Sequence, residues 1–257
     1  MKFIRKLILF LFIFLFIRTT LYSYRTNTPL QLSIYPPIAL FEEPNVYGLD
    51  LGILYTKSYN VYGLQFSLAA SLVEENFYGI QLGVLLARSE GNSYGIQLGV
   101  LGAGSGKNSY GVQLGGLLAW LEGNSYGIQL GVLGAGSGKD CYGAQLGGIC
   151  CWTEKEFYGV QFSVGFNYIG EYLYGLQISN INVSKEVFLG QVGLLLNDTK
   201  KLTGFQVGII NKADEVAGVQ IGIINYTNSL KGIQIGGINI TKQYRISPVM
   251  IGINLNW

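Results

Sequence analysis

Apolar and polar positions alternate with a period of two in short segments that recur along almost the whole chain. One side of the segment at residues 94–101 carries Tyr94, Ile96, Leu98 and Val100, and the other side carries Gly95, Gln97, Gly99 and Leu101. A period of two is the side-chain period of a β-strand, so each segment predicts one strand of about ten residues. Glycine-rich and polar segments such as GAGSGKNS and WLEGNS separate the strands and predict short turns.

The segments share the pattern Gly-h-Gln-h-Gly/Ser, in which h is apolar, and they recur every 14 to 16 residues. Their central residues are Asp50, Gln65, Gln81, Gln97, Gln113, Gln129, Gln145, Gln161, Gln177, Gln191, Gln206, Gln220 and Gln234. A degenerate copy centred on Met250 brings the number of units to 14. Self-similarity at a nearly fixed period indicates a repeat architecture, so we expect a single repeat β domain over residues 47–257.

Two all-β architectures accommodate one strand and one turn per unit. In an up-and-down antiparallel transmembrane β-barrel of about 14 strands, each unit is a strand that runs back beside the one before it. In a parallel β-solenoid of 14–16-residue coils, each unit is one coil and like residues stack in ladders. We expect the barrel and keep the solenoid as the alternative.

Several features favour the barrel. The core Tyr-Gly-h-Gln-h-Gly-h reads similarly in both directions, as strands of alternating direction require. Between residues 81 and 156 the turns alternate between GAGSGK and forms such as ARSEGN, as in hairpins with two different ends. The strand length suits a tilted membrane strand, and a Tyr at the start of successive strands predicts aromatic girdles at both interfaces. These residues are Tyr47, Tyr62, Tyr78, Tyr94, Tyr110, Tyr126, Tyr142, Tyr158 and Tyr174.

In the barrel, the apolar side would face lipid and the thirteen central residues would form a belt inside the lumen, with Asp50 as its only charge. Neighbouring Gln amides can donate and accept hydrogen bonds around such a belt. A barrel of this size has a radius of roughly 14 Å, which leaves a water-filled passage. We therefore expect a weakly selective pore for small polar solutes, or a belt that only satisfies the polar wall. The alternative is a surface-exposed β-solenoid with a structural or adhesive role.

The N-terminus resembles an export signal. Three basic residues precede the apolar stretch Leu7–Ile17, which is too short to span a bilayer, and the expected cleavage follows Ser23. Residues 24–46 then form an N-terminal segment in which Leu30–Tyr35 predicts a possible extra strand.

The amino-acid composition limits the classes of function that the chain can have. Only 12% of the residues are charged, about half the usual share of a soluble domain, and the net charge of +2 argues against nucleic-acid binding. The chain has no His and three Cys, and GAGSGK lacks the residues of a phosphate-binding loop, so we expect no enzyme, no metal and no cofactor. Asn-x-Ser/Thr triplets at Asn182, Asn197, Asn225 and Asn239 are interpreted as turn residues at strand exits.

The Gly-h-Gln-h-Gly units, the 14-residue variants GFQVGIINKADEVA and GVQIGIINYTNSLK, and the tail SPVMIGINLNW resemble a family of bacterial surface repeat-containing proteins of the spirochaetal type. The tail is also similar to the closing strand of outer-membrane β-barrels. The resemblance covers roughly residues 30–257 and implies export to the outer membrane or cell surface of a double-membraned bacterium. Membrane lipid and the outer-membrane assembly machinery are its implied partners, and it implies no catalytic residues. The chain departs from the family pattern at Leu189, which takes the usual Gly position before Gln191.

Overall fold

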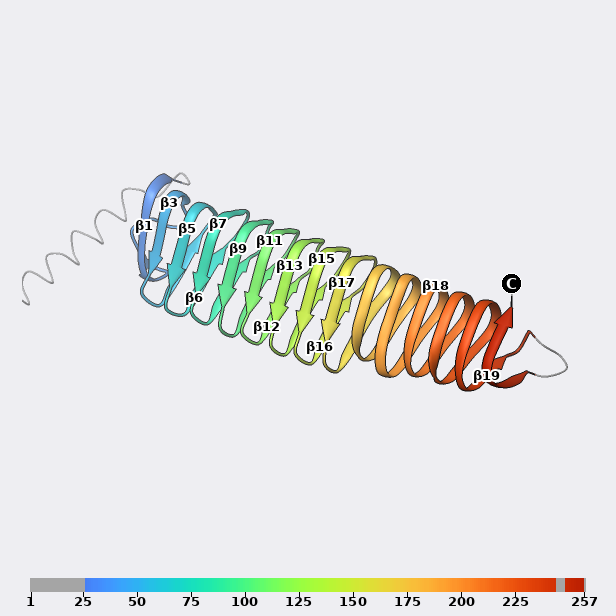
Figure 1. Cartoon of the computed structure of the whole chain (residues 1–257). Helices are drawn as coiled ribbons and strands as arrows, with labels where there is room; N and C mark the ends of the chain where they lie inside the picture. The colour runs from blue at the N-terminus through green and yellow to red at the C-terminus, as the bar shows by residue number, and fades with distance from the viewer. Residues whose placement is uncertain (1–25, 244–247, 257) are drawn as a thin grey trace, which may run out of the picture.

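The computed structural model describes residues 26–243 and 248–256, which form a rod of stacked β coils (Figure 1). The strands are β1 (Asn27–Tyr35), β2 (Ile38–Ala39), β3 (Asn45–Gly52), β4 (Tyr55–Ser58), β5 (Asn60–Ser67), β6 (Ala70–Val73), β7 (Phe77–Gly83), β8 (Leu86–Ser89), β9 (Ser93–Gly99), β10 (Gly102–Ser105), β11 (Ser109–Gly115), β12 (Leu118–Leu121), β13 (Ser125–Gly131), β14 (Gly134–Ser137), β15 (Cys141–Gly147), β16 (Cys150–Thr153), β17 (Phe157–Ser163), β18 (Phe166–Thr241) and β19 (Val249–Asn256). The expected signal sequence at residues 1–23 lies outside the described residues.

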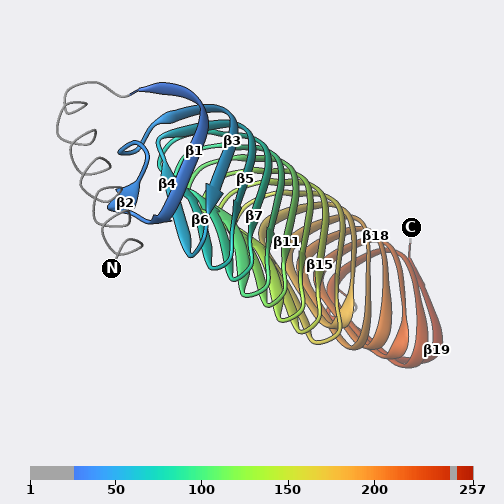
Figure 2. The same ribbon diagram turned by 90° about the vertical axis from the view of Figure 1, so that its left-hand side faces the viewer.

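The coils stack in parallel and in register, so the predicted antiparallel barrel is wrong and the fold is a parallel β-solenoid. Strand β9 pairs with β7 on one side and β11 on the other, and Gln97 lies opposite Gln81 and Gln113. The same register places each leading Tyr beside the Tyr of the next coil. Like residues therefore form ladders along the rod. Figure 2 shows the stacked coils in an oblique view from the N-terminal end.

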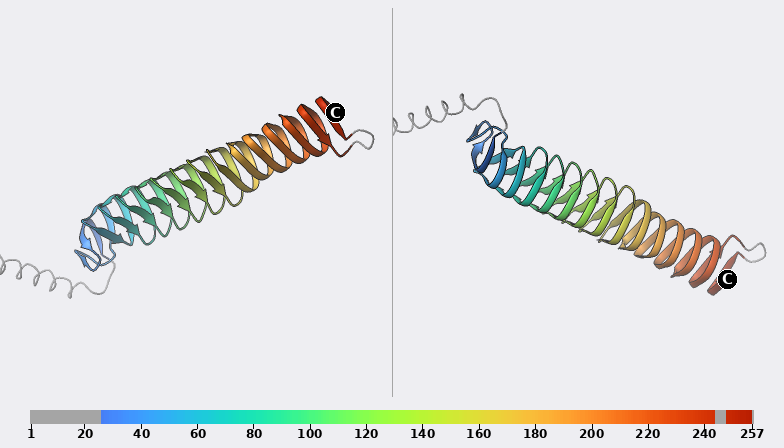
Figure 3. Two further views of the ribbon diagram at one scale, coloured as in Figure 1. Left: turned by 90° about the horizontal axis from the view of Figure 1, so that it is seen from below. Right: turned by 90° about the horizontal axis from the view of Figure 1, so that it is seen from above.

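Each 16-residue coil consists of a long strand and a short strand that face each other across a narrow interior. In one such coil, β7 is the long strand and β8 the short one, and the next coil repeats them as β9 and β10. In the 14-residue units the extended backbone continues through the bends, and β18 winds through several coils without a break (Figure 3). The rod is therefore continuous across the change of repeat length.

The two glycines of each motif are required for different steric reasons. The motif therefore reads similarly in both directions although all the long strands run the same way. Gly95 has φ +130°, and a Cβ there would collide with the carbonyl oxygen of Gly79 in the preceding coil. Gly99 faces the short strand of its own coil, and a Cβ there would collide with the carbonyl oxygen of Gly102. The first glycine allows an unusual backbone and close stacking of coils, whereas the second lets the two strands of one coil approach.

The two ends of the rod depart from the parallel pattern. At the N-terminal end β1, which includes the predicted strand Leu30–Tyr35, pairs in parallel with β3, and β2 folds back antiparallel onto the end of β1. At the C-terminal end β19 pairs antiparallel with the last part of β18. Antiparallel pairing in the described residues is thus found at the ends. Met250 lies opposite Asn239, not opposite Gln234, so the tail does not form the fourteenth repeat coil that the sequence predicted.

Candidate functional site

The central Gln residues form a continuous hydrogen-bonded ladder inside the solenoid. Each Gln Nε2 donates to the side-chain oxygen of the central residue in the preceding coil, over 2.7–3.0 Å, from Gln65 through Gln234. The Gln side chains are 0–1% exposed. An amide with a donor at one end and an acceptor at the other can repeat this bond indefinitely, and chains of such bonds reinforce one another.

Asp50 is the N-terminal end of this ladder. Its carboxylate accepts hydrogen bonds from Gln65 Nε2 at 2.9 Å, from Ser58 Oγ at 2.7 Å and from Thr56 Oγ1. The side chain is completely buried, and loss of hydration raises the pKa of the carboxyl although the three donors lower it. Gln31 of the preceding coil bonds instead to the backbone of Phe41. Asp50 therefore ends the ladder as an acceptor.

A second amide ladder, which the sequence analysis missed, runs beside the first in the C-terminal half. Its members are Asn167, Asn182, Asn197, Asn211, Asn225 and Asn239, all fully buried. Each Asn Nδ2 donates to the Oδ1 of the Asn in the following coil over 2.8–3.3 Å. The triplets interpreted as turn residues belong to this ladder. The signal was their constant offset of five or six residues from the central Gln.

The two ladders point in opposite directions along the rod. Gln donors point toward the N-terminal coils and Asn donors toward the C-terminal coils, so their amide dipoles oppose each other. The ladders meet the last strand together: Asn254 Nδ2 donates to Gln234 Oε1 at 2.8 Å, and Asn239 Nδ2 donates to the carbonyl oxygen of Gly252 at 2.8 Å. The side-chain amides of both ladders therefore make their hydrogen bonds within the solenoid.

This arrangement corrects the interpretation of the Gln belt as the lining of a pore. All thirteen central residues lie on the side of the strands opposite the apolar residues, in a ladder along the rod and not in a ring around a lumen. That side faces a packed interior, in which the Gln amides contact the backbone of the facing strand, as Gln97 does with the carbonyl oxygen of Gly104 at 3.1 Å. The water-filled lumen was a consequence of the barrel fold, and no feature of the solenoid supports a pore for solutes.

In the described part of the chain, the interior holds no cluster of metal-ligating side chains and no reactive thiol. The three cysteines are free, and burial raises the pKa of the Cys141 thiol to about 12, which keeps it protonated. Among residues 26–243 and 248–256, no group of three or more His, Cys, Asp or Glu side chains is arranged to hold a metal ion. The candidate functional site is therefore the outer surface.

The outer surface of the long strands is strongly apolar. On one coil it presents Ile96, Leu98 and Val100, and the adjoining bend adds Leu101. Ile128, Val132 and Leu133 repeat this pattern two coils later, and they are exposed. We name this surface the apolar face: the residues one before, one after, three after and four after each central residue.

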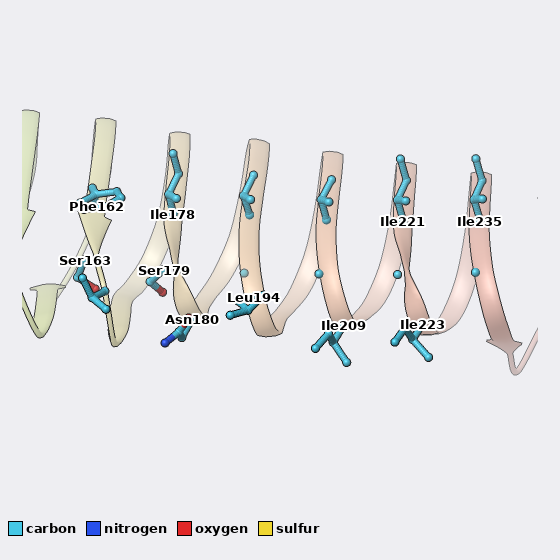
Figure 4. Close-up of a pocket in the computed structure, with 17 residues that line it drawn as sticks. Phe162, Ser163, Ile178, Ser179, Asn180, Leu194, Ile209, Ile221, Ile223 and Ile235 are labelled. Atoms are coloured by element: carbon cyan, nitrogen blue, oxygen red, sulfur yellow. The ribbon is translucent and has the colours of Figure 1, made fainter.

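The apolar face is hollowed into a shallow groove along the rod axis. In the C-terminal half its volume is about 800 Å³, and Figure 4 shows two rows of side chains on either side of it. Phe162, Ile178 and Ile235 belong to one row, and Ile209 and Ile223 to the other. Glycine and serine form the floor between the rows because the long strand approaches its partner there.

The same groove recurs at the N-terminal end, where β2 closes it. Leu32, Leu51 and Phe66 line it there, together with Ile38 of β2, and the volume is about 570 Å³. The groove therefore occurs near both ends of the rod, between the two rows of apolar side chains that the repeat generates.

A row of stacked tyrosines borders the apolar face on one side. The rings run from Tyr47 to Tyr174 and continue to Phe188, with centroids 4.5–5.0 Å apart and interplanar angles of 1–9°. On the other side, past the apolar bend, lie the partly exposed Trp120 and Trp152 of the short strands. Aromatic residues with a polar tip thus flank the apolar face on both sides.

Charges collect on the opposite edge of the rod, at the bend that follows the short strands. Lys107 of this bend pairs with Glu75 two coils earlier, at 3.8 Å. A second ion pair, between Lys212 and Asp198 of the preceding coil at 3.0 Å, lies at the position that Gly104 and Trp120 occupy in the short strands. The solenoid is consequently amphipathic about its long axis, with a polar interior, an apolar face and a charged edge.

No helix in the described part of the chain has the length and apolar character needed to cross a bilayer. No family model, no curated protein and no solved structure matches the chain. Functional inference therefore starts from the amphipathic solenoid itself.

Proposed function

We propose that this protein is an exported, non-enzymatic β-solenoid that acts as an adhesive rod and attaches through its apolar face to a lipid surface. The observation that carries the proposal is the division of the rod into an apolar face and an opposite charged edge over its whole length. Exposed apolar patches of this extent mark interaction sites on soluble proteins.

The chemistry of the borders favours lipid as the partner. A surface element that lies in the plane of a bilayer places apolar side chains in the acyl region and charges in water. Tyrosine and tryptophan concentrate where these two environments meet, because their rings are apolar and their tips polar. The stacked tyrosines on one side and Trp120 and Trp152 on the other satisfy this requirement. The N-terminal sequence pattern supports an exported location.

Flotation with vesicles of zwitterionic phosphatidylcholine tests the proposal, because such vesicles minimise net electrostatic attraction. The protein should float with the vesicles. The triple change Ile96→Glu, Ile128→Glu and Val160→Glu introduces three charges on the apolar face, and each should cost several tenths of a kcal/mol to a few kcal/mol of transfer free energy. We expect at least a tenfold loss of vesicle binding.

The control changes Lys107, Lys139 and Lys155 to Glu, all on the charged edge. This variant also gains negative charge but leaves the apolar face intact, so it should float like the wild type. Equal loss in both triple variants, or no flotation of the folded wild-type protein, would contradict attachment through the apolar face.

A further inference from the structure

The apolar face is most exposed along one row of side chains in the middle of the rod. Val100, Val132 and Val164 are 59–61% exposed, and Leu194 and Ile223 are 65% and 59% exposed. Each lies three residues after the central Gln of its coil. Extended apolar surface of this kind on a soluble protein marks a place where another surface packs. In the absence of lipid, the face therefore lacks the partner that the proposed function gives it.

Two rows with a groove between them give the apolar face its relief. One row lies one residue after each Gln and includes Ile178 and Ile221, and the other is the exposed row that includes Ile209 and Ile223 (Figure 4). Positions two residues apart on a strand are separated by about 7 Å, and successive coils by ~4.8 Å. The groove is thus about as wide as one row of apolar side chains.

The floor of the groove offers its polar groups to the rod itself. Ser163 Oγ donates to the carbonyl oxygen of Phe166 at 3.0 Å, and Ser179 Oγ donates to that of Ile181 at 2.6 Å. Of the residues that line this part of the groove, only Asn180 adds a polar side chain to a row. A matching surface must therefore be apolar and must repeat with the coil spacing, and the apolar face itself meets both conditions.

The area of the face is sufficient for a stable dimer. From the coil of Gln65 to that of Gln234 there are eleven steps of ~4.8 Å, or about 53 Å. The face extends over four residues of ~3.3 Å along each strand, or about 13 Å. The flat area is then roughly 700 Å², and the ridged surface exposes more than that. A standard interface buries about 800 Å² on each partner.

We infer that, in water, two copies of the protein cover each other's apolar faces, and that this dimer is the lipid-free form. A two-fold axis parallel to the rods brings the exposed row of each copy into the groove of the other, so one patch serves both subunits and the contact closes. Both surfaces have the same coil spacing, so the rows interlock as in the dry interface of paired cross-β sheets. Lipid and the second copy compete for the face.

The inference rests on the face that the proposed function assigns to lipid, but the two are measured separately. Without lipid, light scattering coupled to size exclusion should give the mass of two chains. Small-angle X-ray scattering should give a thicker particle with the maximum dimension of one rod. A monomer, or a dimer about twice as long as one rod, would overturn the inference. A monomer that still floats with vesicles leaves lipid attachment standing, whereas a compact dimer that never floats contradicts lipid attachment alone.

The double variant Leu194→Lys and Ile223→Lys places two charges on the exposed row and should weaken the dimer at least tenfold. The control, Phe166→Lys and Tyr168→Lys, adds the same charges at residues that are 38% and 40% exposed and are aligned with Cys150 and Trp152 of the short strand. It should remain a dimer. Circular dichroism must show the same β signal for all three proteins. Equal weakening in both variants, or weakening in the control alone, would count against pairing through the apolar face.

Competition with lipid is tested by energy transfer between two copies. Copies labelled on the lysines of the charged edge with a donor or an acceptor should show energy transfer when they are mixed in water. Phosphatidylcholine vesicles in large excess should abolish the transfer, because each face then meets lipid. Transfer that persists on floated protein at low surface density would show that the copies stay paired, and the competition would be refuted.

Discussion

The indole of Trp120 lies across Gly104, its partner in the preceding coil. The two residues are opposite each other in the pair of β10 with β12, and a Cβ at Gly104 would lie 2.8 Å from Cε2 of the indole. Trp152 covers Gly136 in the same way two coils later. A large ring on one coil therefore requires small residues on the coil before it, and the short strands alternate between GAGS and Trp-containing sequences for this reason.

This relationship predicts a strong energetic coupling between the two positions. Gly104→Leu should lower the free energy of unfolding by about 1–3 kcal/mol, because the added side chain occupies the space of the indole. Trp120→Ala removes the obstacle, so Gly104→Leu should cost less in that background. Denaturant unfolding of the two single variants and the double variant measures the coupling. If the two single effects add within about 0.5 kcal/mol, the residues are not packed as described.

The same pair shows why the sequence led to the wrong architecture. The alternation with a period of 32 residues was attributed to hairpins with two different ends, but it reflects packing between successive coils. The near-palindrome around Gln97 was attributed to reversed strands, but Gly95 and Gly99 are needed for different reasons. The unit length and the separation of Gln from the apolar residues could be read directly, because they depend on local periodicity. The single strand of about ten residues expected in each unit was wrong for the 16-residue coils, which have a strand of seven or eight residues and a second strand of four.

What local periodicity cannot decide is which side of an alternating strand is the inside. The pattern places Gln97 and Ile96 on opposite sides, and burial of either is consistent with alternation. The apolar side is usually buried, or faces lipid, and the barrel followed from that rule. Here Gln97 is buried because amides of successive coils satisfy one another, a condition that exists only after the coils have stacked. The Asn ladder escaped notice for the same reason.

Interruption of the Gln ladder should be costly at its centre. Gln113 Nε2 donates to Gln97 Oε1 at 2.9 Å and to Ser105 Oγ at 3.0 Å, and Gln113 Oε1 accepts from Gln129 Nε2 at 3.0 Å. Gln113→Leu keeps a similar volume but removes all three bonds and leaves buried polar atoms with fewer partners. We expect a loss of about 2–4 kcal/mol in the free energy of unfolding, measured by denaturant titration.

The control for the ladder is Asn228→Leu, which removes an exposed amide from the charged edge. Surface amides exchange protein partners for water at little cost, so this variant should unfold within about 0.5 kcal/mol of the wild type. Similar losses in the two variants would mean that the buried ladder contributes no more than a surface bond.

Leu189 predicts a stabilising substitution. It takes the position that glycine fills in the other coils and has φ +128°, a conformation that strains any residue with a Cβ. Leu189→Gly removes this strain at the expense of a side chain that is already 55% exposed. We expect the free energy of unfolding to rise by about 1 kcal/mol, measured as a higher midpoint of thermal and denaturant unfolding.

A neighbouring leucine supplies the comparison. Leu194 is 65% exposed and lies in ordinary extended backbone, so Leu194→Gly should lower the free energy of unfolding by about 0.5–1 kcal/mol. If both glycine variants are less stable than the wild type, the strain at Leu189 does not outweigh the flexibility that glycine adds to the unfolded chain.

Asp50 should make the stability of the rod depend on pH in a direction unusual for a carboxylate. Burial raises its pKa in the folded state above the ordinary value near 4, so folding favours the protonated form. Its contribution is complete below the pKa of the unfolded state and is lost as the pH rises through the folded pKa. Asp50→Asn removes the titration and keeps a similar shape. The wild type should therefore lose stability relative to Asp50→Asn as the pH rises from about 4, until the folded carboxyl is fully ionised and the difference levels off.

Urea unfolding of both proteins between pH 4 and 8 measures that difference. Asp198→Asn, which removes the 33% exposed partner of Lys212, is the control for the loss of a carboxylate at the surface and should have a small effect. A difference between the wild type and Asp50→Asn that grows in favour of the wild type with rising pH would show that the hydrogen bonds from Thr56, Ser58 and Gln65 outweigh the desolvation of the ladder's end.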